Sequence, residues 1–563
     1  MEYMKSYEEW INNPYFDEET KKELLNIQND EKEIQERFYK NLEFGTGGLR
    51  GVIGAGTNRI NKYTVRRATF GLANYIISEC NDEGKNKGVV IAYDSRHKSE
   101  EFCLEAAKTL AACGIKAYIF DSLRPTPELS FAVRYLDCVA GIVITASHNP
   151  PEYNGYKVYW TDGGQVCPDI ANEIIKEVNK IEDYSLIPTT DKSNELIKVL
   201  GDDVDTAFIN AVKEQVINQD IIKEQGKDFK IIFTPIHGTG NVSIRRVLSE
   251  VGFENVEVIK EQEMPDPNFS TVKYPNPEEK EVFNIAIEKA KKEGSDIIIG
   301  TDPDCDRVGV VVKDNKGEYI VLNGNQVGSL LVEYVISNLF NENKTSNNST
   351  IVKTIVTSEL GAEIAKSYGV GSIDTLTGFK FIGEKIHEFE ETNEMNFIMG
   401  YEESYGYLVG THARDKDGVV SSLLISEMAA YYKSKGMSLY DGLMDIYSKY
   451  GYYMEELKSI TLKGIDGMEQ IKNIMSYFRN NNMDLIANTK IKELKDYSHG
   501  IDNLPKSDVL KFILEDESWI AVRPSGTEPK IKFYVGVKGE DLQSSTQKIE
   551  EYLDSITSIV ESI

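Results

Sequence analysis

A serine on a short polar loop is the residue of this chain best suited to covalent chemistry. Ser147 lies in the segment 145–150 (TASHNP), directly after the apolar, β-branched run 139–144, which is typical of a buried strand. Pro150 and Pro151 prevent a helix from starting at once. A hydroxyl displayed at the end of a strand can act as a nucleophile or carry a phosphoryl group, but the same residue types also make ordinary turns. From these six residues alone, both interpretations stay open.

Three aspartates at every second position form the next chemical motif. Asp302, Asp304 and Asp306 follow the apolar segment 296–300, and in an extended backbone their side chains point to one side. Three like charges repel one another unless a cation neutralises them, and carboxylate oxygens are the ligands that Mg²⁺ prefers. The pattern therefore predicts a magnesium site.

Other interpretations compete with this magnesium site. An EF-hand also begins Asp-x-Asp-x-Asp, but it needs glycine at the sixth position and glutamate at the twelfth, where this chain has Arg307 and Lys313. A site of the haloacid-dehalogenase type, with Asp302 as the nucleophile, also places Asp-x-Asp after a strand. That arrangement leaves Asp306 and Arg307 without a role. A solvated acidic turn also stays open.

Two further loops carry polar groups that suit a phosphorylated sugar. The segment 523–530 (RPSGTEPK) combines Arg523, two hydroxyls, an unshielded glycine N–H and Lys530, an inventory that suits phosphate. The segment 400–406 (GYEESYG) offers adjacent carboxylates and a hydroxyl, which suit the hydroxyls of a sugar. Each segment can also be a plain surface turn.

These loops need strands and helices to hold them, and the chain supplies a repeated pattern. A strand–loop–helix–glycine–strand unit occurs three times, over 89–120, 230–259 and 351–375. Strands that alternate with helices at this spacing imply parallel α/β sheets. Three similar units indicate a repeated α/β domain rather than one large sheet.

The two ends of the chain differ from these repeats. Residues 1–40 are acidic and helical in pattern, which predicts a helical lead-in packed on the first domain. Near the C-terminus, 519–522 and 531–535 have the pattern of paired strands around a turn, which suggests a smaller α+β domain. The predicted domains are 1–200 with the Ser147 loop, 201–322 with the aspartate loop, 323–455 with the 400–406 loop, and 456–563 with the 523–530 loop.

Composition argues against several classes of function. The 563 residues carry a formal net charge of −28, whereas nucleic-acid partners need basic faces. The six cysteines lack CxxC spacing, which favours free thiols in a reducing cytoplasm over a disulfide framework or a zinc site. No apolar run is long enough to span a membrane, and the N-terminus lacks the apolar core of a signal peptide. We therefore expect a cytoplasmic protein with no membrane or nucleic-acid partner, and no obligate protein partner is implied.

Taken in their order along the chain, the four loops resemble those of the α-D-phosphohexomutase superfamily. The segment 145–150 resembles the phosphoserine loop, 302–307 the metal loop, 400–406 the sugar-recognition loop and 523–530 the phosphate loop. Three further segments are most like the longer branch of the superfamily, namely 44–51, 154–157 and 412–418. That branch contains phosphoglucomutases and phosphopentomutase-like enzymes. The resemblance implies three similar mixed α/β domains and a smaller C-terminal α+β domain around a central cleft.

The resemblance also implies chemistry and roles for individual residues. Phosphorylated Ser147 is expected to exchange its phosphoryl group with a sugar phosphate, with Mg²⁺ as cofactor and a bound hexose 1,6-bisphosphate as intermediate and activator. The implied catalytic residues are Ser147, His148, Lys157 and Arg50; the metal ligands are Ser147, Asp302, Asp304 and Asp306; and the substrate-binding residues are Glu402, Ser404, Lys380, Arg307, Arg523, Ser525, Gly526 and Thr527.

The substrate and one alignment stay open at this stage. Tyr401 interrupts the shorter Gly-Glu-x-Ser pattern of the family, so the choice of Glu402 and Ser404 depends on a one-residue alignment. The implied activity is that of a phosphoglucomutase, with mannose and pentose phosphates as alternative substrates. Two further classes also stay open, namely an enzyme with an aspartate nucleophile and a non-catalytic sugar-phosphate sensor.

Overall fold

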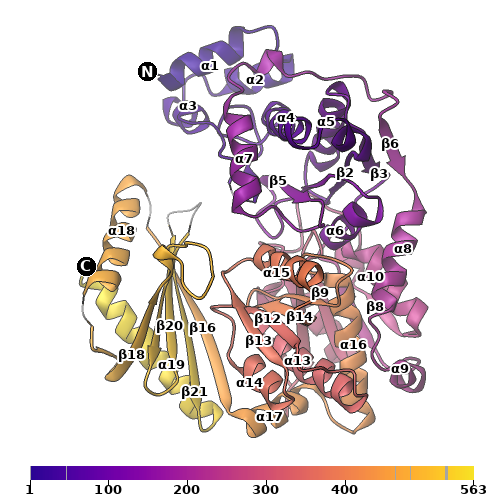
Figure 1. Ribbon diagram of the computed structural model, residues 1–563, viewed down its shortest axis with the longest axis vertical. Coiled ribbons are helices and arrows are strands. Elements are labelled where there is room, and N and C mark those ends of the chain that lie inside the picture. Colours follow the sequence, from indigo (N-terminus) through magenta and orange to yellow (C-terminus); the bar gives the residue numbers. More distant parts are fainter. Residues whose placement is uncertain (1, 46, 463, 482, 526–529) are drawn as a thin grey trace. The chain divides into compact units, whose positions relative to one another are not determined.

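The computed structural model describes residues 2–45, 47–462, 464–481, 483–525 and 530–563 (Figure 1). Contacts within the chain divide it into two compact units. Unit 1 comprises Met1–Leu322, Phe379–Asn393 and Ser404–Ser438, and unit 2 comprises Asn323–Gly378, Glu394–Glu403 and Leu439–Ile563.

Three short helices at the N-terminus pack together through aromatic side chains. They are α1 (Glu2–Asn12), α2 (Glu18–Asn26) and α3 (Glu31–Phe38), drawn in indigo in Figure 1. The buried ring of Trp10 contacts Phe38 and also Tyr63, which belongs to α4 (Lys62–Lys87) of the following domain. This contact confirms the predicted helical lead-in.

The first sheet of unit 1 is mixed rather than purely parallel. Its strands are β1 (Gly48–Val52), β2 (Val89–Tyr93), β3 (Ala117–Phe120), β4 (Ala140–Ile144), β5 (Tyr153–Trp160) and β6 (Ile197–Leu200), in the order β1-β5-β4-β2-β3-β6. The pairs β2–β3, β2–β4 and β3–β6 are parallel, as the repeat predicts. β5 is antiparallel to both β4 and β1, because the chain turns back directly through the Ser147 loop.

Helices cover both faces of this sheet. They are α4, α5 (Ser99–Ala112), α6 (Thr126–Tyr135), α7 (Pro168–Asn179) and α8 (Asp202–Lys213), with a 3₁₀ turn η1 (Tyr184–Leu186) after α7. Along β2, Val89 and Ile91 pack in a core with α4, α5 and α7, and the alternate residues Val90 and Ala92 pack with α6 and α8. Both faces are buried, which explains why the strand is a continuous apolar run.

The second sheet of unit 1 has five strands in the order β11-β10-β9-β7-β8. Its strands are β7 (Ile231–Thr234), β8 (Val256–Val258), β9 (Ile297–Thr301), β10 (Val308–Lys313) and β11 (Tyr319–Leu322). β7 is parallel to β8 and β9, whereas β9, β10 and β11 are joined by antiparallel pairs. The other elements of unit 1 are α9 (Gln219–Gln225), α10 (Gly240–Val251), α11 (Lys260–Glu263), η2 (Lys280–Phe283), α12 (Asn284–Glu293), α15 (Phe379–Thr392), β15 (Gly406–Val409) and α16 (Gly418–Ser434).

Unit 2 begins with a third α/β arrangement. Its elements are α13 (Gly324–Asn341), β12 (Ser349–Thr354), α14 (Leu360–Ser367), β13 (Gly371–Thr375), β14 (Asn396–Glu402) and α17 (Leu439–Tyr450). β12 is parallel to β13 on one side and to β14 on the other. The predicted repeat over 351–375 is therefore confirmed as β12, α14 and β13.

The C-terminal part of unit 2 is an antiparallel sheet with two helices on one face (Figure 1). Its elements are β16 (Tyr452–Thr461), α18 (Gly464–Asn480), β17 (Leu485–Ile486), β18 (Thr489–Asp496), η3 (Tyr497–His499), β19 (Leu510–Leu514), β20 (Trp519–Pro524), β21 (Lys530–Gly539) and α19 (Leu542–Glu561). The strand order is β16-β21-β20-β19-β18-β17. The predicted pair of strands is confirmed as β20 and β21, and sequence patterning missed most of the others.

Several general expectations from the sequence are confirmed by this fold. The chain has three α/β arrangements and a smaller α+β arrangement at its C-terminus, whereas the exact domain boundaries stay a prediction. The cysteines are all free thiols. Within the described part of the chain, no helix combines the length and the apolar character needed to cross a membrane.

Glu455 on β16 makes part of the stability of unit 2 depend on pH. Burial is the main cause that raises the pKa of Glu455 from its usual 4.5 to about 7, against hydrogen bonds from Ser358 and Asn325 that lower it. A raised carboxyl pKa means that the folded state favours the protonated form. The protonated Glu455 carboxyl therefore contributes its full stabilisation to the folded state below pH 4.5, and this contribution is lost as the pH rises towards 7.

We expect Glu455→Gln to remove this loss of stability. The variant should match the parent near pH 5 and exceed its unfolding free energy by about 2–3 kcal/mol near pH 8. Calorimetric unfolding at the two pH values measures the difference, with Glu493→Gln on the exposed face of β18 as the control. An equal effect of both substitutions, or no dependence on pH, would contradict the argument.

Candidate active site

Two of the predicted chemical loops meet inside unit 1. The Ser147 loop follows β4 and the aspartate loop follows β9, so both lie at carboxyl ends of strands, where open α/β sheets hold their ligands. The Ser147 hydroxyl donates a hydrogen bond to Oδ2 of Asp302 at 2.9 Å, although the two residues are 155 positions apart. The serine and the acidic motif therefore form one buried site.

The three aspartates converge and retain unused oxygen atoms. One carboxylate oxygen from each residue lies within 4.8 Å of the others, and all three residues are buried. Asp302 Oδ1 accepts hydrogen bonds from the backbone N–H groups of Asp306 and Arg307, which hold the loop around it. Among the described residues, Oδ1 of Asp304 and Oδ1 of Asp306 have no hydrogen-bond partner. Buried carboxylate oxygens that converge without donors fit a hard divalent cation such as Mg²⁺.

Two lysines neutralise part of this charge. Lys157 Nζ, from β5, lies 2.9 Å from Asp304 Oδ2 and 3.3 Å from Asp306 Oδ2, and Lys416 Nζ lies 3.2 Å from Asp306 Oδ2. Burial favours the neutral form of Asp306, but Lys416 and Lys157 outweigh it and lower the pKa of this carboxyl. Burial and the carboxylates of Asp304 and Asp306 raise the pKa of Asp302 instead.

The structure separates the two residues that were predicted as proton acceptors. His148 Nδ1 lies 3.1 Å from Ser147 Oγ, whereas Lys157 contacts the aspartates. Burial, together with the cations Arg307 and Arg50, lowers the pKa of His148 well below its usual range. Burial alone would lower the pKa of Lys157, but Asp304 and Asp306 raise it overall. The imidazole is therefore neutral and beside the serine, and the lysine stays charged.

A buried ion pair holds the backbone of the Ser147 loop, and sequence patterning missed it. Ser147 has a φ of 52°, a left-handed conformation that is uncommon outside glycine. The Arg96 guanidinium donates to the carbonyl oxygens of Ser147, Asn149, Pro150 and Tyr153. These bonds attach four carbonyl groups of the loop and of the start of β5 to one buried side chain.

Asp94 fixes the arginine and the serine in one network. Its carboxylate lies 3.3 Å from Arg96 Nε and accepts a hydrogen bond from the hydroxyl of Thr145 at 2.6 Å. The Thr145 hydroxyl in turn accepts the backbone N–H of Ser147 at 2.8 Å. The ring of Phe269 covers the guanidinium at 4.9 Å. Asp94 and Arg96 therefore position the serine without touching a substrate.

We expect Arg96→Lys to lower kcat by about 10- to 100-fold with little change in KM. Lysine keeps the charge but offers one point of attachment where the guanidinium serves several carbonyls, so the serine loses its orientation. Steady-state kinetics measure the effect, with Arg245→Lys on the exposed surface of α10 as the control. An Arg96→Lys enzyme within twofold of the parent would contradict the positioning role.

The other predicted cations of unit 1 surround this site at different distances. Arg50 is exposed on β1, and its Nη1 lies 3.4 Å from Asn149 Oδ1. Arg307 Nη1 donates to Glu278 at 2.5 Å, and its Nε lies 3.9 Å from Asp306 Oδ1. Lys380 lies in the first turn of α15, with its ammonium over the ring of Phe381.

Lys416 was missed because its segment was interpreted only as a source of charge. Lys416 also hydrogen-bonds Asp415, and Asp415 accepts the hydroxyl of Tyr159 at 2.7 Å. The charged run 414–417 directly before a helix was the available signal. The sequence did not indicate that this lysine would reach the aspartate loop more than a hundred residues earlier.

The predicted sugar loop begins at the end of β14, where every residue from Phe397 to Glu402 is buried. Tyr401 is buried against Gly328 and Gly361, positions at which any Cβ would overlap the tyrosine ring or hydroxyl. The inserted residue is therefore part of the core of unit 2. Glu402, the next residue, points to the opposite face of the strand and is also buried.

The neighbours of Glu402 are held by different contacts. Glu403 Oε2 accepts hydrogen bonds from the hydroxyls of Thr354 and Thr357, both at 3.1 Å, which gives it a structural role. Ser404 belongs to unit 1, and the next residue, Tyr405, accepts the backbone N–H of Val308 just after the aspartate loop. The choice of Glu402 and Ser404 as sugar contacts stays a prediction.

The structure describes only part of the predicted phosphate loop, residues 523–525 and 530. Arg523 lies at the end of β20. Its charge lowers the pKa of the Tyr534 hydroxyl, whereas the charges of Glu403 and Glu402 raise it. Burial is the main cause that raises the pKa of Tyr534. The backbone N–H of Ser525 donates to the carbonyl oxygen of Lys530 at 2.7 Å. Gly526 and Thr527 lie outside the described residues.

Comparison with known proteins agrees with this geometry. Four family models match the chain: phosphoglucomutase/phosphomannomutase alpha/beta/alpha domain I over 41–185, domain II over 206–317, domain III over 323–450 and the C-terminal domain over 481–550. The order of the models is the order of the sheets along the chain. The similarity therefore covers most of the chain and includes the serine and aspartate loops.

Individual relatives show the same extent of similarity. A phosphoglucomutase of Staphylococcus haemolyticus is 38% identical over 92% of this chain and 94% of its own length. A phosphoglucomutase of Staphylococcus aureus is 38% identical over 94% and 95%. The solved structure of pp63/parafusin, a phosphoglucomutase from Paramecium, has a TM-score of 0.70 at 19% identity, covers 93% of this chain and 96% of its own, and supports the fold. With the Ser147 loop, the aspartate cluster and all four domain models in place, this chain belongs to the phosphoglucomutase/phosphomannomutase family.

Proposed function

We propose that the chain is a phosphoglucomutase, which interconverts glucose 1-phosphate and glucose 6-phosphate through a phosphoserine at Ser147 and a bound glucose 1,6-bisphosphate. The observation that carries the proposal is the hydrogen bond from the Ser147 hydroxyl to Asp302, inside a cluster in which Oδ1 of Asp304 and Oδ1 of Asp306 lack donors among the described residues. The relatives named phosphoglucomutase support the choice of glucose over other sugars.

The reaction needs a proton acceptor at Ser147. In the first half, the bond from Ser147 Oγ to phosphorus breaks, a new bond forms to O6 of the sugar, and the proton of the O6 hydroxyl passes to Ser147 Oγ. In the second half, the bond from O1 to phosphorus breaks, Ser147 Oγ takes the phosphoryl group and loses its proton, and O1 gains a proton. His148 Nδ1 lies 3.1 Å from Ser147 Oγ and is neutral, so it is the proposed acceptor.

The charged groups around the serine suit a transferring phosphoryl group. Asp302, Asp304 and Asp306 are the proposed ligands of Mg²⁺, which when bound offsets the charge on the phosphoryl oxygens. Lys157 and Lys416 hold the aspartates in their cluster, and Arg307 lies at its edge. Arg50 is the proposed contact to the phosphate from the open side, since it is exposed beside Asn149.

Residues from the other loops are the proposed contacts for the rest of the substrate. Glu402 and Ser404 would accept and donate hydrogen bonds to sugar hydroxyls that occupy similar positions after the intermediate turns over. Lys380 would add a positive charge for the phosphate that does not react. The proposed anchor for that phosphate is Arg523, Ser525, Gly526 and Thr527.

A single assay series tests this assignment of substrate. Purified protein with Mg²⁺ and a trace of the matching 1,6- or 1,5-bisphosphate is supplied with glucose, mannose, glucosamine and ribose 1-phosphates. We expect kcat/KM for glucose 1-phosphate to exceed the others by at least about tenfold. A higher value for mannose or ribose 1-phosphate would replace the substrate while retaining the mutase. Tight binding of glucose 1-phosphate without turnover would indicate a sensor.

A further inference from the structure

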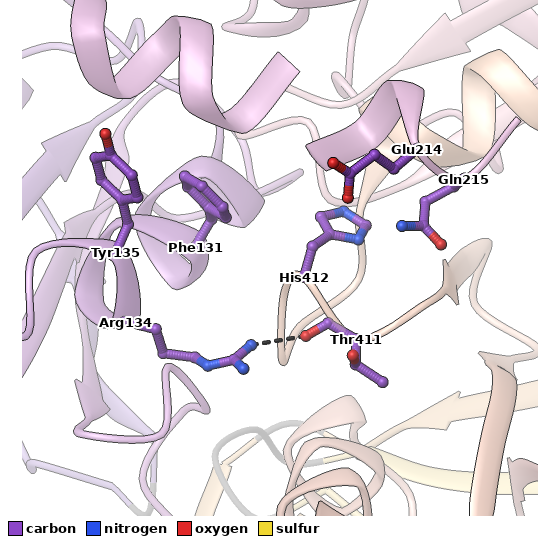
Figure 2. A pocket seen from close by; sticks show the side chains of 7 residues that line it. All are labelled: Phe131, Arg134, Tyr135, Glu214, Gln215, Thr411 and His412. Atoms are coloured by element: carbon purple, nitrogen blue, oxygen red, sulfur yellow. Dashed lines mark hydrogen bonds between the residues drawn. The ribbon is translucent and has the colours of Figure 1, made fainter. Parts of the chain in front are cut away.

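A pocket of about 390 Å³ lies in unit 1 between α6, the end of α8 and the loop after β15 (Figure 2). Its size is within the range of small-molecule sites. Figure 2 shows two aromatic side chains on one side and an imidazole, a carboxylate and an amide on the other. The lining residues are Phe131, Arg134, Tyr135, Glu214, Gln215, Thr411 and His412. None of them contributes to the site around Ser147.

The imidazole in this pocket has an unused acceptor. The His412 side chain is 5% exposed, and its Nε2 lies 2.7 Å from Oδ2 of Asp417. Because a carboxylate only accepts hydrogen bonds, Nε2 carries a proton, and in the tautomer with one ring proton Nδ1 is a lone-pair acceptor. Among the described residues, Nδ1 is buried without a hydrogen-bond partner. A buried acceptor without a donor is costly, so a donor from a ligand fits here.

The carboxylate at the rim offers a second unused acceptor. Glu214 is exposed just after α8, and within the described part of the chain its carboxylate makes no hydrogen bond or ion pair. The facing rings of Phe131 and Tyr135 are stacked with centroids 5.4 Å apart, and Tyr135 is 53% exposed. Aromatic faces beside a carboxylate are the usual surroundings of organic cations in proteins.

The one cationic side chain that lines the pocket is already engaged. Arg134 donates to the carbonyl of Thr411 at 2.6 Å, the dashed line in Figure 2, and lies 3.6 Å from Glu390. Its charge is therefore shared with a carboxylate, and the Glu214 carboxylate repels anions from the opposite side. These contacts disfavour a phosphorylated ligand, so the pocket is not a second site for the sugar phosphates.

We propose that this pocket binds a small organic cation that carries N–H donors on a planar body, of the amidine or guanidinium class. Its N–H groups would donate to Glu214 and to Nδ1 of His412, and its plane would lie against Tyr135 and Phe131. The rings of Phe131 and His412 are backed by the buried ring of Phe208, whose centroid lies 5.7 Å from that of Phe131 and 6.2 Å from that of the imidazole. Shape and charge therefore select the same class of ligand.

Three isosteric probes test the charge that the pocket selects. Benzamidine, benzamide and benzoate share a planar shape and carry a positive, zero and negative charge. Isothermal titration calorimetry of the full chain in physiological salt should show saturable one-to-one binding of benzamidine, with a Kd on the order of 0.1–1 mM. Benzoate should bind at least about tenfold more weakly. Equal or tighter binding of benzoate, or no saturable binding of benzamidine, would overturn the proposal.

Substitutions at the rim locate the bound probe. Glu214→Gln should weaken benzamidine binding by about tenfold, since it removes a charged acceptor, and Tyr135→Ala should weaken it by about threefold or more. Both positions are exposed, so thermal unfolding should match the parent. Glu224→Gln, an exposed carboxylate on α9, is the control for overall charge. Unchanged affinity in Glu214→Gln, or equal losses in both glutamate variants, would reject this pocket. Because no sugar phosphate or turnover is involved, the result is independent of the mutase proposal.

Discussion

Ser147→Ala is expected to reduce mutase turnover by at least about 10⁴-fold, because it removes the oxygen that carries the phosphoryl group. Within the described part of the chain, the buried hydroxyl makes two side-chain hydrogen bonds, to Asp302 and His148, so its loss should leave the fold intact. Turnover is measured with glucose 1-phosphate, Mg²⁺ and a trace of glucose 1,6-bisphosphate, and KM for any residual activity is determined in parallel.

Ser95→Ala provides a matched control for this loss. Ser95 is a buried serine on the neighbouring loop, and its hydroxyl has no partner among the described residues. Its substitution should leave turnover within about twofold. Phosphoprotein formed from glucose 1,6-bisphosphate should be stable to acid in the parent and absent in Ser147→Ala. A phosphoprotein that hydroxylamine cleaves, and that survives in Ser147→Ala, would identify Asp302 as the nucleophile instead.

Asp302→Asn is expected to change activity and stability in opposite directions. Asparagine has the same shape, so its Oδ1 can still accept the backbone N–H groups of Asp306 and Arg307, while its amide can donate to Ser147. The substitution removes one of three crowded like charges, which should raise the unfolding free energy of the metal-free protein by about 1 kcal/mol. It also removes a proposed metal ligand, so mutase activity should fall by at least about 10³-fold.

Thermal unfolding with and without MgCl₂ measures the stability and the metal response of each variant, and the mutase assay measures its loss of activity. The parent should gain stability as Mg²⁺ is added, because a ligand that binds only the folded state stabilises it, and Asp302→Asn should gain much less. Asp220→Asn on the exposed surface of α9 is the control and should respond to Mg²⁺ like the parent. A metal-free Asp302→Asn protein that is markedly less stable than the parent would show that like-charge repulsion does not dominate at this cluster.

Sequence patterns predicted the strands that are buried on both faces of a sheet. The apolar run 89–93 became β2 with every residue buried, because helices cover the sheet on both sides. The segments 145–150 and 302–307 were found for a related reason, since turns at strand ends concentrate polar and conformationally special residues. Their chemistry is local to each segment, so composition and spacing within a few residues were sufficient.

Contacts between distant segments were beyond these patterns. The repeat over 89–120 gave no sign of a role for Asp94 or Arg96, yet Arg96 binds carbonyl groups of the loop some fifty residues later. Lys416 gave no local sign that it pairs with Asp306. The roles of His148 and Lys157 were equally undecided, since both are close to Ser147 in sequence. A pairing of this kind depends on sheet order and burial, which no local pattern encodes.

The sequence by itself determined the chemical inventory of this protein and the type of its domains: a serine loop, three aspartates and repeated strands and helices, each set by local spacing. Only the tertiary structure decided how that inventory is used. It placed Asp302 2.9 Å from Ser147, assigned the neutral His148 to the serine and the charged Lys157 to the aspartates, and formed the separate pocket at His412. The physical reason is that hydrogen bonding, charge pairing and burial act over a few ångströms in space, whichever positions the partners occupy along the chain.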